Sequence, residues 1–276
     1  GRVSYAPIGD ALNGLATHGT LAHTVADAAA LLDVMSGYIT GDPYWLPDPN
    51  PSFVQGALTA AQQGVKPLRI AFSTAIAPIG AADASCAQAV LDTAKLLESL
   101  GHQVEPDFPE GTTDIVEPFT LVWRTGVSAC GLPPQAMQPM NQWLYEQSHS
   151  GGDYQKAVWA LQVASRRIVA FFDRYDALLL PTYLHPTIRV GEWANLSPAE
   201  TLEKVIRWIA PCPVANTTGQ PAIALPTGTF TPEGLPLGVQ IVGRPADEAT
   251  LIALAAQIEV ARPWSQNRPP LAIASA

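Results

Sequence analysis

The side chains that could act as metal ligands, bases or nucleophiles are scattered along this sequence. Its histidines are His18, His23, His102, His149 and His185, and no two of them have the i, i+4 spacing of a metal-binding helix. His18 and His23 stand five residues apart near a helix start, which favours solvated or capping side chains. No GxSxG, HExxH or GxxxxGK[ST] pattern occurs, and no GxGxxG opens a helix. We therefore expect no metal and no cofactor.

The cysteines are few and far apart. Cys86, Cys130 and Cys212 include no CxxC pair, which speaks against a disulfide framework and favours a reducing, cytoplasmic location. Cys130 ends an apolar helical stretch and is followed by Gly131. Two interpretations stay open for it, a small buried hydrophobe and a residue that lines a ligand pocket. A catalytic thiolate would need a positive partner, and none lies near it in sequence.

A polar run, NTTGQPA, begins at Asn216 and precedes an apolar strand pattern. Hydrogen-bonding side chains beside a Gly-Pro turn suit a loop that faces a ligand. They suit equally a buried polar turn whose groups bond to one another. The residues of this run leave both interpretations open.

Composition sets limits on the class of protein. The chain has 276 residues, of which 47% are hydrophobic and 14% charged, so it is long and apolar enough to bury a core. The net charge of -9 and the absence of Lys/Arg clusters exclude a nucleic-acid surface. No stretch approaches the roughly 20 apolar residues of a membrane span, so we expect no membrane association.

Hydrophobic periodicity and turn residues predict an α/β protein. Thr24, with Asp27 three residues later, marks the N-terminus of a helix that Gly37 ends, and Ser197 followed by Pro198 marks another. The expected helices cover residues 24–36, 83–100, most of 113–175, 198–210 and 247–260. The expected strands cover residues 68–72, the surroundings of 104, 177–180, 222–225 and 238–242. The first two strands with the helix between them predict a parallel βαβ unit.

The same pattern divides the chain into three stretches. Residues 1–65 are expected to hold one core helix and a connecting loop, because residues 41–51 are rich in Pro and Asp. Residues 66–176 hold the βαβ unit and a helical region, and residues 177–276 return to the core sheet and end in a helix.

Several ordered motifs are informative when they are taken together. They are Arg2-Val3-Ser4 after Gly1, TVADAAALLDVMSG at residues 24–37, LLLPT at 178–182, the Asn216 run, GLPLGVQIVGR at 234–244, Glu248, and Pro263-Trp264. In order and spacing they resemble the C-terminal part of the amidase signature family. The resemblance covers residues 1–276 as part of a single amidase domain. It implies a large mixed β-sheet flanked by helices, incomplete at the N-terminal side.

The resemblance also implies a reaction. Members of this family hydrolyse amide bonds through a serine acyl-enzyme, with a second serine in a cis peptide and a lysine. Their Gly/Ser-rich stretch and lysine precede the segment that GRVS resembles, so the catalytic residues are expected upstream of Gly1. The sequence thus assigns no catalytic residue to this chain and predicts that the chain alone is inactive and folds imperfectly.

The expected substrate is a small carboxamide or oligoamide. The candidate pocket residues are Trp123, Cys130, His185 and Asn216; for Trp123, core packing is the competing interpretation. The expected protein partner is the missing N-terminal segment or a second protomer.

Two alternatives to a hydrolase remain open. One is a non-catalytic binding or interaction protein that retains the amidase scaffold. The other is the A-type subunit of an amidotransferase, although the Ser-Leu-Asp-Gln stretch usual in that subunit does not match residues 14–21.

Overall fold

The centre of the molecule is a mixed five-stranded sheet. The computed structural model describes residues 1–147 and 149–267. The sheet is formed by β1 (Arg69–Phe72), β4 (Gln103–Pro106), β5 (Ala177–Pro181), β6 (Ala222–Phe230) and β7 (Pro236–Gly243). The strand order is β4-β1-β5-β7-β6, with β1 parallel to β4 and β5, and β7 antiparallel to β5 and β6. The α/β fold with a mixed sheet is confirmed.

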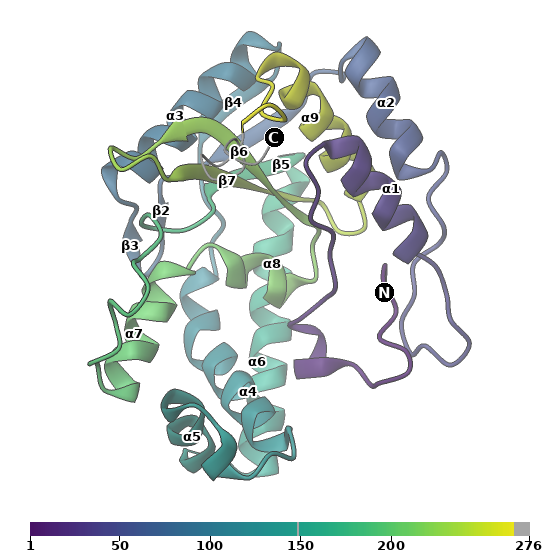
Figure 1. Ribbon diagram of the computed structural model, residues 1–276. Helices are drawn as coiled ribbons and strands as arrows, with labels where there is room; N and C mark the ends of the chain where they lie inside the picture. Colours follow the sequence, from purple (N-terminus) through teal and green to yellow (C-terminus); the bar gives the residue numbers. More distant parts are fainter. Residues whose placement is uncertain (148, 268–276) are drawn as a thin grey trace, which may run out of the picture.

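Four helices cover one face of the sheet (Figure 1). They are α1 (Val25–Met35), α2 (Phe53–Gln63), α3 (Ala84–Ser99) and α9 (Glu248–Ala261). Their buried side chains share one core with Leu179 of β5 and Ile241 of β7. Both faces of β5 are buried, which explains its uninterrupted apolar run.

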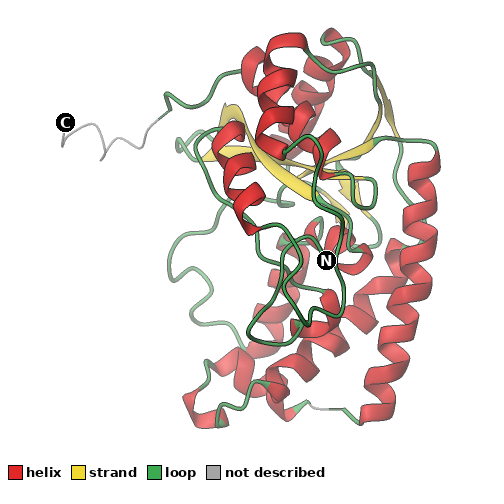
Figure 2. Cartoon of the chain, turned by 90° about the vertical axis from the view of Figure 1, so that its right-hand side faces the viewer, coloured by secondary structure: helices red, strands yellow, loops and turns green. Residues whose placement is uncertain are grey.

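A helical lobe lies below the sheet in Figures 1 and 2. Its helices are α4 (Val116–Ala129), α5 (Pro139–Glu146), α6 (Gly151–Ala170), α7 (Pro198–Trp208) and α8 (Cys212–Thr218), with short 3-10 turns η2 (Thr112–Ile115), η3 (Pro134–Ala136) and η4 (Phe171–Asp173). A small hairpin, β2 (Ala75–Ile76) and β3 (Gly80–Ala81), lies beside the lobe. The 3-10 turn η1 (Ala11–Gly14) belongs to the N-terminal segment, which runs between lobe and sheet (Figure 2).

The predicted helix ends are confirmed by hydrogen bonds. The Thr24 hydroxyl accepts the Asp27 amide at 3.1 Å and donates to the Asp27 carboxylate at 2.7 Å. Ser197 and Glu200 form a full capping box at the start of α7. The parallel pairing of β1 with β4 confirms the βαβ unit.

Two helices were not predicted. Residues 53–63, expected to lie in a connecting stretch, form α2, which is capped by Ser52 and stops at Gly64. Residues 212–218 form α8, so the prediction of a loop at Asn216 was wrong in its local structure. Both helices are small-residue segments with few large apolar side chains to mark a period, and both are held by packing against neighbouring elements.

Within the described residues, no helix combines the length and the apolar character needed to cross a membrane.

A polar cluster fixes the outer side of the sheet at β4. The Tyr175 hydroxyl lies 2.8 Å from a Glu105 oxygen and 2.9 Å from an Asp107 oxygen, and having one proton it donates to one of them at a time. The Arg174 and Arg69 guanidinium groups stand 5.1 and 5.4 Å from the centre of the tyrosine ring. Burial, with the two acceptor carboxylates, raises the pKa of Tyr175. Burial opposes ionisation of Asp107, but hydrogen bonds and the Arg174 charge lower its pKa overall.

We expect Tyr175→Phe to lower the free energy of unfolding by about 1–2 kcal/mol at pH 7, because a hydrogen bond to a carboxylate is lost. A tyrosine whose folded pKa is raised contributes full stability below its unfolded pKa of about 10 and loses it as pH rises further. Urea denaturation at pH 7 and 10.5 should therefore show a gap between the two proteins that narrows at the higher pH. Tyr44→Phe, on a ring that is 73% exposed, is the matched control. A gap that stays constant would contradict the assigned hydrogen bond.

Candidate functional site

A groove of about 1210 Å³ lies between the sheet and the helical lobe. It is lined by the N-terminal segment before α1, one side of α1, the first half of β6, and parts of α6 and α8. β6 is the edge strand of the sheet, and residues 222–226 of it face this space. The groove is a large concave surface lined by strand, helix and N-terminal segment, so it is the candidate site.

Three residues that line this groove carry buried polar atoms without a hydrogen-bond partner in the described part of the chain. Gln220 is 5% exposed; its amide nitrogen donates to the Gly243 carbonyl at 2.5 Å, and its side-chain oxygen has no hydrogen-bond partner among the described residues. The hydroxyls of Thr217 and Tyr5 are also buried and have no hydrogen-bond partner among the described residues. Burial and the Asp10 carboxylate raise the pKa of Tyr5, so its hydroxyl stays protonated. Unpaired buried groups are rare, and a ligand or another polypeptide segment would satisfy them.

Two neutral groups, the Cys212 thiol and the Gln240 amide, line part of the groove. The Cys212 thiol lies 3.9 Å from the Thr182 carbonyl, and burial raises its pKa to about 11. At neutral pH it is therefore a thiol and a poor nucleophile. Beside it the Gln240 side-chain amide donates to the Pro211 carbonyl at 3.2 Å. The thiol and the amide are both neutral at this pH, so they supply no base.

The four predicted pocket residues do not converge. Asn216 lines the groove, and its amide donates to the Leu15 carbonyl at 2.7 Å. Trp123 lines a separate apolar cavity on the other side of α8. Cys130 is exposed at the end of α4, so the buried alternative for it is wrong. Their roles toward a substrate stay predictions.

His185 lies elsewhere, in an aromatic cluster. Its ring stacks on Trp208 with centroids 5.7 Å apart, and Tyr183 packs on the same indole at 4.8 Å. The Nδ1 atom of His185 is 2.8 Å from the Pro186 carbonyl, which can only accept, so Nδ1 carries the proton. In residues 1–147 and 149–267, no group of three His, Cys, Asp or Glu side chains could hold a metal ion.

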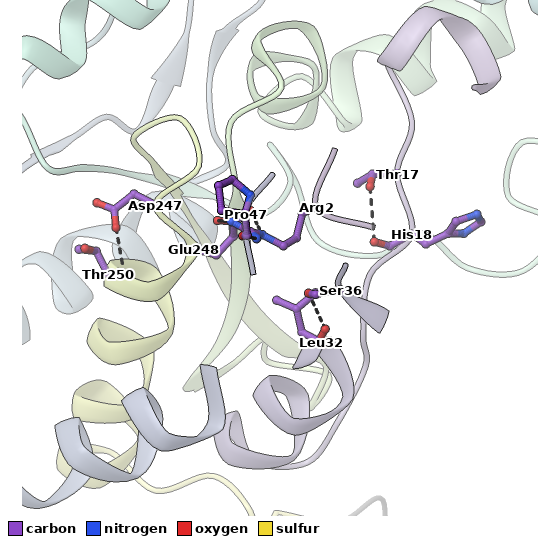
Figure 3. Close-up of polar contacts among 9 residues, drawn as sticks. All are labelled: Arg2, Thr17, His18, Leu32, Ser36, Pro47, Asp247, Glu248 and Thr250. Carbon is purple, nitrogen blue, oxygen red and sulfur yellow. Dashed lines mark hydrogen bonds and ion pairs between the residues drawn. The ribbon is translucent and has the colours of Figure 1, made fainter. Parts of the chain in front are cut away.

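The sequence did not predict an ion pair between Arg2 and Glu248, two residues that line the groove. Arg2 donates from two nitrogens to the two carboxylate oxygens of Glu248, at 3.0 and 3.1 Å (Figure 3). The guanidinium also donates to the Pro47 carbonyl at 2.6 Å and lies 5.3 Å from the centre of the Phe53 ring. The two side chains are only 14% and 13% exposed. Both residues stand in motifs named from sequence, but nothing in the sequence indicates that they touch.

Comparison with known proteins identifies the class. The family model described as Amidase matches residues 1–130 and 131–252. The chain therefore belongs to the amidase family, and the expected family membership is confirmed.

Three relatives illustrate the match. A Synechocystis sp. protein named "Putative amidase" is 47% identical over 268 residues, covering 97% of this chain and 52% of the relative. The 6-aminohexanoate-cyclic-dimer hydrolase of Pseudomonas sp. is 31% identical over 303 residues, covering 98% of this chain and 59% of that protein. A solved structure of 6-aminohexanoate cyclic dimer hydrolase matches with a TM-score of 0.88 at 28% identity, covering 99% of this chain and 61% of that one. The chain thus spans about half the length of the curated relatives it matches.

Proposed function

We propose that this chain forms the scaffold and part of the substrate pocket of an amide-bond hydrolase that acts on a small carboxamide or oligoamide. The serine pair and the lysine of the reaction would come from a segment equivalent to the remaining part of the longer relatives. That segment would precede Gly1 in a longer polypeptide or be supplied by a second protomer. The observation that carries the proposal is the groove, whose size, edge strand and unpaired polar atoms suit a polypeptide partner.

The exposure of the lysines in this chain supports the proposal that the catalytic lysine comes from another segment. A lysine acts as a neutral base where burial or a neighbouring positive charge lowers its pKa. Lys66, Lys95, Lys156 and Lys204 are all exposed, and within the described part of the chain none hydrogen-bonds to a serine side chain. In the proposed acyl transfer, a serine oxygen attacks the amide carbon, the amine leaves with a proton, and water then releases the acid.

The proposal is tested by complementation. The chain is assayed against simple carboxamides alone and together with the part of the Synechocystis relative that this chain does not match. We expect no turnover by the chain alone and at least about 100-fold more with the added segment, abolished by a serine-directed reagent. Turnover by the chain alone that is sensitive to that reagent would mean that the catalytic serine lies within it. Binding of the segment without turnover would favour the non-catalytic scaffold instead.

A surface variant makes the same test specific to the groove. Ala224→Lys places a charge on an exposed position of β6 that lines the groove, so the chain should still fold but fail to complement. Ala170→Lys, exposed at the end of α6 and outside the groove, should complement normally. Equal complementation by both variants would show that the segment does not dock there.

A further inference from the structure

One wall of the groove is a short segment that lies between two glycines in open space. Residues 10–18, called the strap from here on, belong to the N-terminal segment between lobe and sheet, and most of them line the groove (Figure 2). Gly9 precedes the strap and Gly19 follows it, and a side chain at either position would meet no atom within 4 Å. Because glycine turns freely about its backbone bonds, the two positions suit a pair of hinges.

The strap is attached to the lobe mainly by two leucines. Leu12 and Leu15 pack against the apolar cluster that η2, α4, α6 and α8 form. A side chain at Gly126 of α4 would collide with Cδ2 of Leu12, so this leucine fills a notch that glycine alone leaves open. Among the described residues, one hydrogen bond joins the strap to the lobe, from the Asn216 amide to the Leu15 carbonyl at 2.7 Å. These few contacts act as a latch.

The backbone of the latched strap is strained. Leu12 and Asn13 have φ angles of 55° and 54°, in the left-handed region that residues other than glycine rarely adopt. Such a conformation persists only where its surroundings hold it. The contact of Leu12 with Gly126 supplies that hold, and release of the leucine lets the backbone relax. Strain therefore favours an open strap, whereas the apolar contacts favour the closed one.

The strap lies against the side of α8 that faces the groove. Cys212 and Asn216 are one helical turn apart on α8, so they share a face of the helix, and both line the groove. Asn216 holds the strap through the Leu15 carbonyl. The Cys212 thiol thus stands beside the point of attachment, and its accessibility reports the position of the strap.

We propose that the strap is a hinged wall of the groove, which swings about Gly9 and Gly19 when Leu12 leaves Gly126 and so opens the groove toward α8. The hinges and the latch stand on the contacts above. That the opening admits the docking segment of a hydrolase rests on the proposed function. A segment that binds only the open form shifts the strap toward that form.

The rate at which N-ethylmaleimide alkylates Cys212, followed by mass spectrometry of peptides, measures the opening. Cys86, which is 5% exposed in a separate core cluster on α3, is the internal control for general loosening. Gly126→Val fills the notch, so we expect Cys212 to react at least about tenfold faster while Cys86 stays unchanged. Gly56→Val on α2 carries the same helix cost at a glycine in open space, and it should leave both rates unchanged.

Asn13 separates backbone strain from side-chain packing, because its side chain is exposed. Asn13→Ala puts a residue that tolerates a φ of 54° less well into the closed strap, so Cys212 should react about threefold faster. Asn13→Gly relieves the strain and should slow the reaction. Equal rates in the two variants would overturn the strained latch.

A disulfide that locks the strap completes the test. The Cγ atom of Leu12 lies 3.4 Å from a Cβ built at Gly126, near the roughly 3 Å between a disulfide sulfur and the opposite Cβ. In oxidised Leu12→Cys combined with Gly126→Cys, alkylation of Cys212 should fall at least about tenfold and complementation should fail. The reduced form lacks the leucine, so it should react faster than the unaltered protein and complement.

The outcomes distinguish the strap from the hydrolase. Cys212 rates that follow Cys86 in every variant, or that the disulfide leaves unchanged, would overturn the hinged wall. Normal complementation by the locked protein would overturn the role of the strap in admitting the segment. Failure of every variant and of the unaltered protein to complement, with the alkylation rates as expected, would count against the hydrolase alone.

Discussion

Replacing Arg2 by alanine is expected to lower the free energy of unfolding by about 3 kcal/mol, because Glu248 is left as a largely buried charge without its partner. The pair is bidentate, both side chains are nearly buried, and a third hydrogen bond reaches Pro47 (Figure 3). It ties the first residues of the chain to the first turn of α9, where a carboxylate is also favoured by the helix dipole. Urea denaturation at neutral pH measures the change.

A double-mutant cycle separates the pair from other effects. Glu248→Ala alone should cost a similar amount, and the double variant should cost clearly less than the sum, because no unpaired charge remains. Lys156→Ala, which removes an ion pair with Asp153 from an exposed helix surface, should leave the unfolding midpoint unchanged. Additive losses in the cycle would mean that Arg2 acts through packing on Phe53 rather than through Glu248.

Much of the fold follows from local signals in the sequence. Short-range patterns predicted three elements, through the caps at Thr24 and Ser197 and the apolar run of β5. The structure has a helix or strand at each of these positions. The helix α2 has a cap at Ser52 and a stop at Gly64, but α2 and α8 carry few large apolar side chains that would mark a helical period. Ala57 and Ala60 of α2 are buried against α1 and α9, so tertiary contacts rather than periodicity hold that helix.

The candidate site was far less predictable, because it depends on contacts across the chain. Arg2 and Glu248 are 246 residues apart, and only the fold brings them together. Trp123 and Asn216 were predicted to share a pocket, yet α8 separates the spaces they line. A glycine in the GLPLGVQIVGR motif shows the same limit. A side chain at Gly238 would meet the Thr182 hydroxyl at 2.9 Å, a close approach that no local pattern reveals.

The largest loss from a single uncharged substitution is expected at the centre of the sheet. Leu179→Ala should lower the free energy of unfolding by about 3–5 kcal/mol, because transfer of the side chain from water is lost and a cavity remains. Leu179 is fully buried and is flanked in the sheet by Phe72 on one side and Ile241 on the other. Rigid strands on both sides prevent the backbone from closing the space. Urea denaturation with circular dichroism measures the loss.

Leu58→Ala on α2 is the matched control, because that leucine is 45% exposed and its truncation leaves no cavity; its effect should stay within about 0.5 kcal/mol. Leu179 faces the core shared with α2 and α9, whereas Leu180 faces the opposite cluster beside Leu184. Leu180→Ala should therefore cost a comparable amount through a different core. A loss below about 1 kcal/mol at Leu179, with the full loss at Leu180, would mean that the helices over the first face do not pack on the sheet in solution. The groove, which α1 and β6 help to line, would then lack the rigid wall that a docking segment needs.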